Sequence, residues 1–132
     1  MATVLRFEDL EVWKEARELA KKIFELTSDI SFPRDYGFIR QINDAAGSIM
    51  DNIAEGFERG SRYEFINYLS FSKGSGGEVR SQIYRGFDRK YFKKVDFDEL
   101  HDRVMSISKK LASLIAYLNQ QNVRGSKFKK RT

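Results

Sequence analysis

Apolar residues recur at steps of three and four positions in four separate stretches of this chain, and that spacing places side chains on one face of an α-helix. The stretches cover residues 8–28, 35–58, 62–89 and 97–118 of the 132. No segment shows the two-residue alternation that indicates a half-buried β-strand. The pattern therefore predicts an all-α protein with four long helices.

Turn and capping signals separate the four stretches. Pro33 biases the residue before it away from helix, and Gly60 stands where a left-handed residue commonly ends a helix. Ser61 to Glu64 and Asp96 to Glu99 both have the spacing of a capping box, so each predicts a helix start. Because the links are short, neighbouring helices should run antiparallel, and we expect an up-down-up-down four-helix bundle.

Three glycines, Gly74, Gly76 and Gly77, interrupt the apolar pattern of the third stretch. In an isolated helix each would cost about 1 kcal/mol relative to alanine. Either the helix kinks there or a neighbouring backbone approaches closely, and close packing is the favoured interpretation. A phosphate-binding loop beside Lys73 is disfavoured, since the Walker pattern needs two glycines five apart, followed by lysine and a hydroxyl residue.

The net charge of +5 comes from one end of the chain. Residues 124–132 carry five basic side chains and no acidic one, whereas residues 1–123 hold 19 of each. We therefore expect one folded domain over residues 1–123 and a basic, disordered tail over residues 124–132. The tail either contacts nucleic-acid backbone, with its aromatic ring stacked on a base, or serves as a solubilising terminus. The candidate contact residues are Arg124, Lys127, Phe128, Lys129, Lys130 and Arg131.

Few residues of this chain suit catalysis or metal binding. The chain has no cysteine, which excludes disulfides, thiolate nucleophiles and Cys-ligated zinc. Its single histidine, His101, has Asp98 three positions earlier, whereas a di-iron bundle needs Glu-x-x-His pairs on two helices. We expect no catalytic residue, no metal, no cofactor and no small-molecule substrate. The disfavoured alternative is an enzymatic pocket built from Glu55, Glu78, Arg59 and Tyr63.

Targeting signals are absent from the pattern of apolar residues. No stretch approaches the roughly 20 consecutive apolar residues that cross a bilayer. The N-terminal residues lack the basic-then-apolar layout of a secretory signal. Both observations predict a cytoplasmic protein with no membrane partner.

Six short segments carry a resemblance to a known family. They are Phe32-Pro33, Tyr36-Gly37, Gln41-Ile42, Ala45-Ala46, Ser48-Ile49 and Asn52-Ile53-Ala54-Glu55-Gly56. In these segments the chain resembles the bacterial four helix bundle proteins encoded in intervening sequences of 23S ribosomal RNA, and the likeness covers about residues 7 to 118. That family is similar in fold to the accessory variability protein of diversity-generating retroelements, which binds a reverse transcriptase and nucleic acid. The resemblance implies a homopentameric barrel of bundles as the expected assembly.

The resemblance also implies a set of motif residues, which are Gln41, Asn52, Glu55, Gly56, Arg59, Ser75, Glu78 and Gln82. The structural interpretation is that Asn52 hydrogen-bonds a neighbouring backbone, while Glu55 meets Arg59 at the i,i+4 spacing of a helix. The functional alternative is a polar cluster formed by Asn52, Glu55 and Glu58.

Two further features concern helix surfaces. Ser75, Glu78 and Gln82 share one helical side, and we expect them to line a polar seam between helices. At the two positions after Ile42 the resembled family commonly has basic residues, whereas this chain has Asn43 and Asp44. That departure weakens any nucleic-acid contact through the second helix.

These observations predict a non-enzymatic, oligomeric four-helix-bundle module that acts as a scaffold for protein interaction. The alternative is an accessory factor that binds structured RNA, or an RNA/DNA partner, through its basic tail and ring surface. The apolar faces of residues 8–28 and 62–89 are wider than one intramolecular contact requires, which favours a homo-oligomer with a pentamer as the expected state.

Overall fold

The computed structural model describes the backbone of residues 4–129 and the side chains of residues 4–121. Within that range a short 3-10 helix, η1 (Phe7–Asp9), precedes four α-helices, which are α1 (Glu11–Ser28), α2 (Tyr36–Glu58), α3 (Arg62–Asp88) and α4 (Lys94–Lys129). The described part of the chain contains no β-strand. The predicted all-α four-helix bundle is confirmed.

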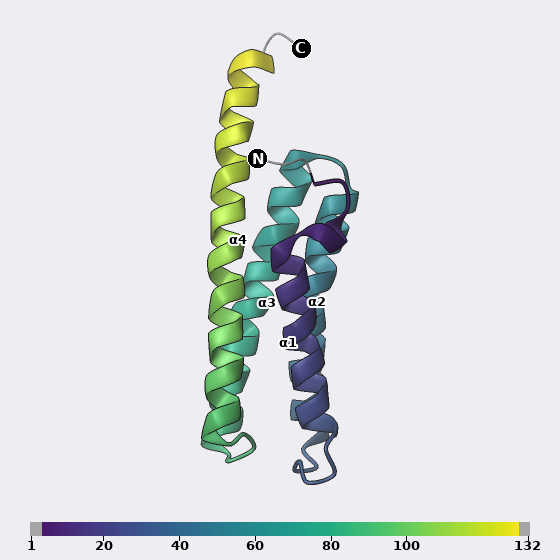
Figure 1. Ribbon diagram of the computed structural model, residues 1–132, viewed down its shortest axis with the longest axis vertical. Coiled ribbons are helices and arrows are strands. Elements are labelled where there is room, and N and C mark those ends of the chain that lie inside the picture. The colour runs from purple at the N-terminus through teal and green to yellow at the C-terminus, as the bar shows by residue number, and fades with distance from the viewer. Residues whose placement is uncertain (1–3, 130–132) are drawn as a thin grey trace.

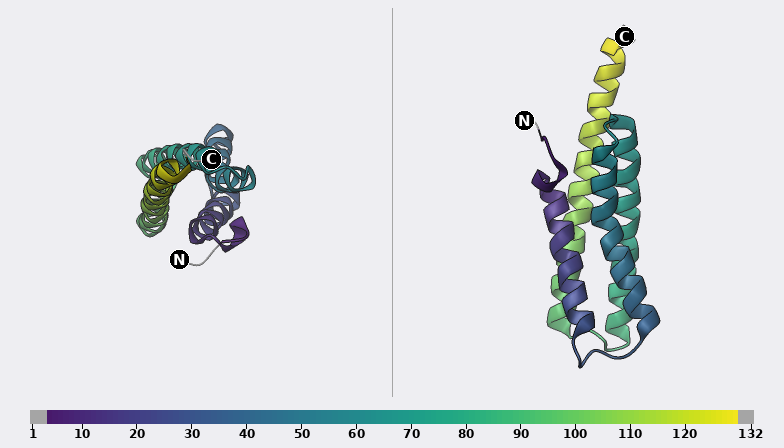
Figure 2. Two further views of the ribbon diagram at one scale, coloured as in Figure 1. Left: turned by 90° about the horizontal axis from the view of Figure 1, so that it is seen from above. Right: turned by 90° about the vertical axis from the view of Figure 1, so that its right-hand side faces the viewer.

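The four helices lie side by side in an elongated bundle, and successive helices run in opposite directions along it (Figure 1). α1 packs against α2 and α4, and α3 packs against the same two helices. Helices α1 and α3 therefore sit diagonally across the bundle (Figure 2). α4 has 36 residues and projects beyond the other helices at the end that carries the α2–α3 corner. Because α1 and α3 are diagonal to each other, the contact between α2 and α3 lies away from the outer side of α1.

Two helix starts differ from the sequence prediction. Helix α1 does not begin at Glu8, because Leu10 takes an extended conformation, with ψ of 125°, between η1 and α1. Helix α4 begins at Lys94 rather than after Asp96, and the backbone N–H of Phe97 already donates to the Lys93 carbonyl at 2.8 Å. The Asp96 carboxylate therefore lies in the first turn of α4, where a negative charge is favourable without being the cap.

The far end of α4 also differs from the expectation. The sequence predicts that the helical pattern fades after residue 118, whereas the backbone is helical through Lys129. Residues 119–122 are Asn-Gln-Gln-Asn, which removes the apolar stripe but introduces no proline to stop the helix. The side chains of the predicted basic tail, residues 124–132, lie outside the described residues.

The corner between α2 and α3 forms as the sequence predicts. Gly60 has a φ of +78°, in the left-handed region that glycine enters without steric penalty. Ser61 caps α3, because its Oγ accepts a hydrogen bond of 3.3 Å from the backbone N–H of Glu64. The Glu64 carboxylate does not complete the capping box and instead lies 3.5 Å from the guanidinium of Arg59.

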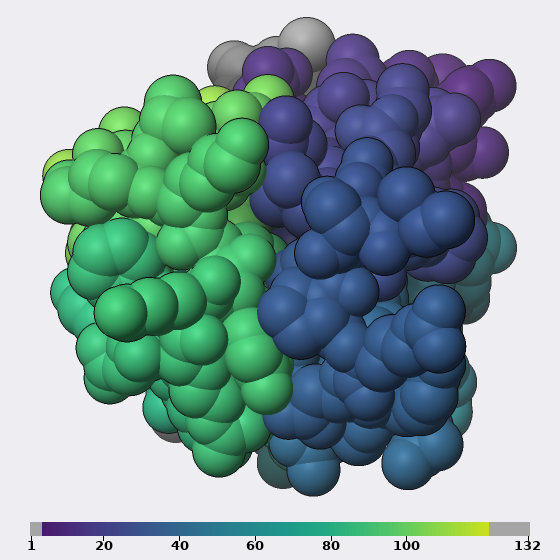
Figure 3. Space-filling model, turned by 90° about the horizontal axis from the view of Figure 1, so that it is seen from below, coloured from purple at the N-terminus to yellow at the C-terminus, as the bar shows by residue number. Residues whose placement is uncertain are grey.

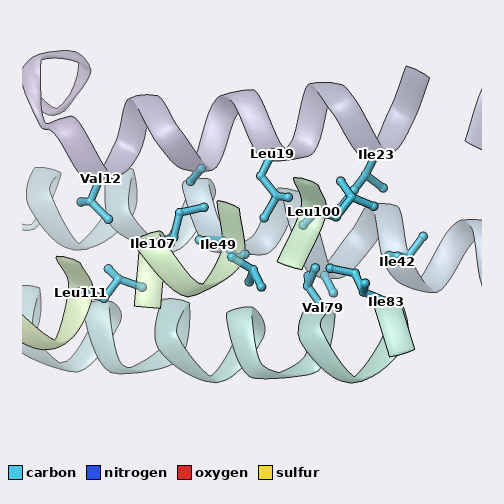
Figure 4. Packing of buried hydrophobic residues seen from close by; sticks show 14 of the residues in the cluster. Val12, Leu19, Ile23, Ile42, Ile49, Val79, Ile83, Leu100, Ile107 and Leu111 are labelled. Carbon is cyan, nitrogen blue, oxygen red and sulfur yellow. The ribbon is translucent and has the colours of Figure 1, made fainter. Parts of the chain in front are cut away.

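The core is a continuous column of branched aliphatic side chains contributed by all four helices (Figure 4). Each fully buried leucine or isoleucine contributes about 1.5–3 kcal/mol relative to an exposed one, so this column is the main source of stability. Its largest fully buried members are Leu19, Ile23, Ile42, Ile49, Ile53, Leu69, Ile83, Leu100, Ile107 and Leu111.

On α3, glycine allows a close approach at Gly86, which the sequence did not predict, rather than at the three predicted glycines. A Cβ atom added at Gly74 or Gly77 would meet no atom within 4 Å, and one at Gly76 would lie in ordinary contact, 3.6 Å from Ser108 Oγ. Helix α3 runs unbroken through all three. A Cβ at Gly86 would instead lie 2.5 Å from the ring of Phe92, so the closest approach on α3 lies almost three turns beyond Gly76.

Candidate functional site

Polar side chains follow the line where α2 and α3 meet, on its solvent side, from one end of the bundle to the other. We call this line the α2–α3 seam. The direct links across it, taken from the α2 N-terminus upward, are Asp35–Arg89 at 3.3 Å, Gln41–Arg85 at 3.1 Å, Ser48–Ser75 at 3.1 Å and Arg59–Tyr68 at 2.8 Å. All eight motif residues expected from the sequence belong to these two helices or to the turn between them.

Asp35 organises the lower end of the seam. Its carboxylate caps α2 by accepting from the Phe38 backbone N–H at 3.2 Å, and it also accepts from the Tyr91 hydroxyl at 2.8 Å and from Arg89. The Tyr91 and Phe38 hydrogen bonds lower the pKa of Asp35, with a smaller contribution from the positive charges of Arg89 and Arg85. Sequence reasoning named Asp35 only as a helix start and missed Tyr91, whose partner lies 56 positions away.

The middle of the seam contains a buried amide. The side chain of Gln82 is only 4 % exposed, and its Oε1 has no hydrogen-bond donor among the residues that the structure describes. About two helical turns away, the Ser75 hydroxyl donates to the Ser48 hydroxyl, which also accepts from Asn52 Nδ2 at 2.9 Å. Ser72 is fully buried and donates to the Ile49 carbonyl at 2.8 Å. This stretch is therefore joined by short hydroxyl and amide groups rather than by ion pairs.

Arg59 gathers the upper end of the seam. Its guanidinium donates to the Glu55 carboxylate at 2.9 Å and to the Tyr68 hydroxyl at 2.8 Å, and it lies 5.2 Å from the centre of the Tyr68 ring. The hydrogen bond that Arg59 donates to Glu55 and the neighbouring Tyr68 raise the pKa of Arg59, with Glu64 adding to the effect. Gly56 lies directly beneath, against the Tyr68 side chain. These contacts lock the α2–α3 corner.

The motif residues Asn52, Glu55 and Arg59 make structural contacts. Glu55 pairs with Arg59 at the predicted i,i+4 spacing. Asn52 does hydrogen-bond a backbone group, but the carbonyl belongs to Ser48 of its own helix, at 2.8 Å, rather than to a neighbouring helix. The Asn52 amide and the Glu55 carboxylate consequently point to different partners, so the polar cluster with Glu58 is not assembled by these bonds.

The residues considered for chemistry lie apart from one another. His101 of α4 has its Nε2 3.3 Å from the Tyr84 hydroxyl, and Asp98 is held by Lys94 at 2.7 Å. Over the described residues, no group of three or more histidine, aspartate or glutamate side chains could hold a metal ion. Of the alternative enzymatic pocket, Arg59 is engaged in the corner contacts and Tyr63 is 68 % exposed.

A cleft of about 570 Å³ opens at the lower end of the bundle, between the α1–α2 loop and the α3–α4 loop (Figure 3). Its floor is aromatic, with the rings of Phe32 and Tyr91 5.6 Å apart. Its rim carries the acidic side chains of Glu25, Asp29 and Asp96 and the basic side chains of Lys90 and Lys93. Because the lining of the cleft carries side chains of both charges, it does not select a ligand charge.

Helix α1 is tied to α4 on the other side of the bundle. Glu15 accepts hydrogen bonds from the Ser106 hydroxyl, at 2.7 Å, and from the Lys110 ammonium. Partial burial of Glu15 opposes its ionisation, but the bonds from Lys110 and Ser106 outweigh that effect and lower its pKa. A second link between α1 and α4 lies nearer the C-terminal end of α1, where Lys22 Nζ is 3.6 Å from the Glu99 carboxylate. None of the described helices is long and apolar enough to span a membrane.

Together the fold and the seam define a class of protein, an all-α bundle whose described polar networks join helix to helix. The family model described as "23S rRNA-intervening sequence protein" matches residues 8–113, and the chain belongs to that family. The expected family is thereby confirmed.

Two further comparisons complete the picture. A solved structure from Bacteroides thetaiotaomicron VPI-5482, described as a protein with unknown function from the S23 ribosomal protein family, has the same fold with a TM-score of 0.74. It is 23 % identical to this chain, and the match covers 80 % of this chain and 95 % of that one. The comparison with curated proteins found no match.

Proposed function

We propose that this protein is a non-enzymatic scaffold that assembles into a homo-oligomer, with a pentamer as the expected state. The observation that carries the proposal is the exposure of large aromatic side chains on the outer faces of regular helices. Phe24 of α1 is 62 % exposed, and on α3 Tyr63 and Phe71 are 68 % and 58 % exposed. Rings that stand on rigid helices in this way are suited to contact another protein surface.

The polar contacts support a scaffold rather than an enzyme. The charged motif residues Glu55 and Arg59 hold each other in a corner, and Asn52 is bound to its own helix. A catalytic site needs an acid, base or nucleophile left within reach of a substrate. Side chains that bond helix to helix make the bundle rigid, and a rigid bundle presents its outer faces in a constant arrangement.

Light scattering coupled to size exclusion tests the proposal. We expect the full chain to elute with a mass near five times the 15.4 kDa of one copy. A mass of one copy at every protein concentration would contradict the scaffold proposal. The variant Phe24→Ser with Phe71→Ser should shift the mass towards one copy, whereas Tyr117→Ser, at the border of exposure on α4, serves as the matched control.

A second candidate function is binding of structured RNA or an RNA/DNA partner through the basic tail. The observation that favours it is the placement of five basic residues and no acid in residues 124–132 of a chain that is otherwise neutral. Five phosphate contacts would make the logarithm of the affinity fall with the logarithm of salt concentration with a slope of about −3.5 to −4.5.

Substitution tests this second function without shortening the chain. A full-length variant with all five basic residues of the tail changed to glutamine should lose most of its affinity for a structured RNA and most of the salt dependence. Affinity that is unchanged in this variant, or that is insensitive to salt in the natural chain, would exclude the tail as the binding element. Neither result bears on the scaffold proposal, because that proposal is tested by the mass of the assembly and this one by the affinity for RNA.

A further inference from the structure

The middle of the α2–α3 seam is acidic. Asp44 lies four positions before Ser48 and Asp51 three after it, while Glu78 lies three after Ser75, so all three carboxylates share the side of the Ser48–Ser75 link. All three are exposed, and within the described part of the chain none of them forms an ion pair. The seam therefore has three uncompensated negative charges at its centre.

The basic residues of the seam cannot neutralise this centre, because they are engaged towards its two ends. Arg89 is bound to Asp35, Arg85 to Gln41, and Arg59 to Glu55. Arg40 lies four positions before Asp44 on α2 and is exposed, but the two side chains form no ion pair. The centre is therefore a surface of hydrogen-bond acceptors that, among the described residues, has no ion pair to a cation of α2 or α3.

Gln82 is an independent sign of a missing donor at the same place. It lies four positions after Glu78 on the same helical side, is only 4 % exposed, and has an Oε1 that accepts from no donor among the described residues. A buried acceptor without a hydrogen-bond partner is unfavourable. The terminal torsion of a glutamine is broad, so a modest rotation of the amide can turn this oxygen towards a donor that arrives at the seam.

An aromatic ring borders the acidic centre. Phe71 lies four positions before Ser75, is more than half exposed, and packs edge-on against the Tyr68 ring with centroids 5.6 Å apart. The Tyr68 hydroxyl is fixed by Arg59, so this pair of rings is held in place. The seam thus combines a rigid apolar anchor with a cluster of carboxylates.

One stripe along the outer side of α1 is basic, beside the exposed carboxylates of Glu11, Glu18 and Glu25. Lys14, Arg17, Lys21 and Phe24 follow one another at steps of three, four and three positions, so they form a single stripe along the helix, and all four are exposed. Within the described part of the chain no carboxylate pairs with these three basic side chains; Arg17 lies over the Trp13 ring at 5.7 Å. The α1 stripe therefore offers three cations and one aromatic ring.

The two surfaces cannot meet within one copy. Helix α1 packs on α2 and α4 and lies diagonally opposite α3 (Figure 2), and the four residues of its stripe are exposed. We propose that the acidic centre of the α2–α3 seam receives the α1 stripe of a second copy, so that carboxylates meet Lys14, Arg17 and Lys21. This inference rests on the proposed homo-oligomer and specifies which faces form it. Since the two faces differ, the contact is head-to-tail, and repeating it gives a ring where the rotation between successive copies closes.

Charge exchange in the full chain tests the pairing. The variant D44K with E78K, and the variant K14E with K21E, should each raise the concentration needed for assembly by about tenfold or more, because like charges then face each other across the contact. The four substitutions combined in one chain should restore assembly. A matched control on α4, D102K with K109E, changes two exposed residues and should leave the mass unchanged. Circular dichroism would verify that every variant keeps its helices.

Cysteine cross-linking gives a second readout, because the natural chain contains no cysteine. A mixture of the full-length variants Lys21→Cys and Glu78→Cys should form a disulfide-linked dimer under mild oxidation, and a mixture of Asp102→Cys with Glu78→Cys should not. If the natural chain is a single copy by light scattering, the proposed oligomer is wrong. If it assembles but neither charge exchange nor the cross-link distinguishes these faces, the oligomer stands and the pairing of seam with α1 stripe is wrong.

Discussion

Gly56 of α2 lies so close to Tyr68 of α3 that a Cβ atom at position 56 would stand 2.5 Å from the Tyr68 Cβ and 3.2 Å from the ring of Phe65. The glycine therefore sets the distance between the two helices just below their shared corner. That spacing also brings the Tyr68 hydroxyl to Arg59 at 2.8 Å. The motif glycine and the motif arginine thus contribute to one contact, the first by leaving room and the second by bonding across it.

Replacing Gly56 by alanine should destabilise the protein by about 1–3 kcal/mol, because the Cβ atoms of two rigid helices cannot separate without shifting the backbone. The matched control is Gly47→Ala in the same helix, where an added Cβ meets nothing within 4 Å. That change should stabilise the protein by up to about 1 kcal/mol through helix propensity. Urea unfolding followed by circular dichroism measures both, and equal effects in the two variants would contradict the close approach.

Helix periodicity was sufficient to predict the bundle, because the core requires only that apolar residues share a face. Leu19, Ile49, Ile83 and Ile107 all stand in the predicted stripes, and all are fully buried. The role of each glycine was harder to predict, since a glycine in a helix can face either a neighbouring helix or solvent. Only the register between helices decides which of Gly56, Gly74 and Gly86 is needed for packing, and a single sequence does not carry that register.

Acid should weaken the lower end of the seam through Asp35. Its pKa is lowered in the folded state by the Tyr91 hydroxyl, the Phe38 backbone N–H and the nearby arginines. The unfolded chain then binds a proton more readily than the folded one, so the stabilisation is present above the ordinary aspartate pKa of about 4 and is lost as pH falls below it. The free energy of unfolding should therefore decrease as the pH falls from about 5 to about 3, roughly one unit on either side of that pKa.

Two variants isolate this contribution. Asp35→Asn and Tyr91→Phe should each narrow the difference in unfolding free energy between neutral and acidic solution, since each removes part of the interaction that lowers the pKa. Asp102→Asn, at an exposed position on α4, is the control that removes a carboxylate elsewhere. An acid dependence that is the same in Asp35→Asn and in the natural chain would show that other carboxylates dominate.

The seam itself could be predicted only in part. Spacing placed Ser75, Glu78 and Gln82 on one side of a helix, and the structure joins Ser75 to Ser48 across the interface. Spacing says nothing about contacts between distant positions, which is why the Tyr91–Asp35 bond was missed. The uncompensated charge of Asp44 was visible in the sequence as a departure from a basic pair, but its neighbours on α3 were not.

The contact between Glu15 and Lys110 should hold α1 to α4. Removing it by Glu15→Gln is expected to cost about 1 kcal/mol, because one partner is half exposed and solvent screens the pair. A double-mutant cycle with Lys110→Met measures the coupling free energy directly. The coupling should decrease at high salt, and a coupling near zero at low salt would mean that Ser106 alone orients the Glu15 carboxylate.

The last prediction concerns Gln82, whose side chain is buried and whose Oε1 accepts from no donor among the described residues. Gln82→Met keeps nearly the same volume and removes the unbonded oxygen, so the unfolding free energy of a single copy, measured at a concentration below assembly, should stay constant or rise by about 1 kcal/mol. Gln41→Met is the control, since it removes an exposed amide that accepts from Arg85 and should change stability by less than about 0.5 kcal/mol. A loss of more than about 2 kcal/mol in Gln82→Met would mean that the oxygen is bonded in solution even in the single copy, because only a bonded buried acceptor is expensive to remove.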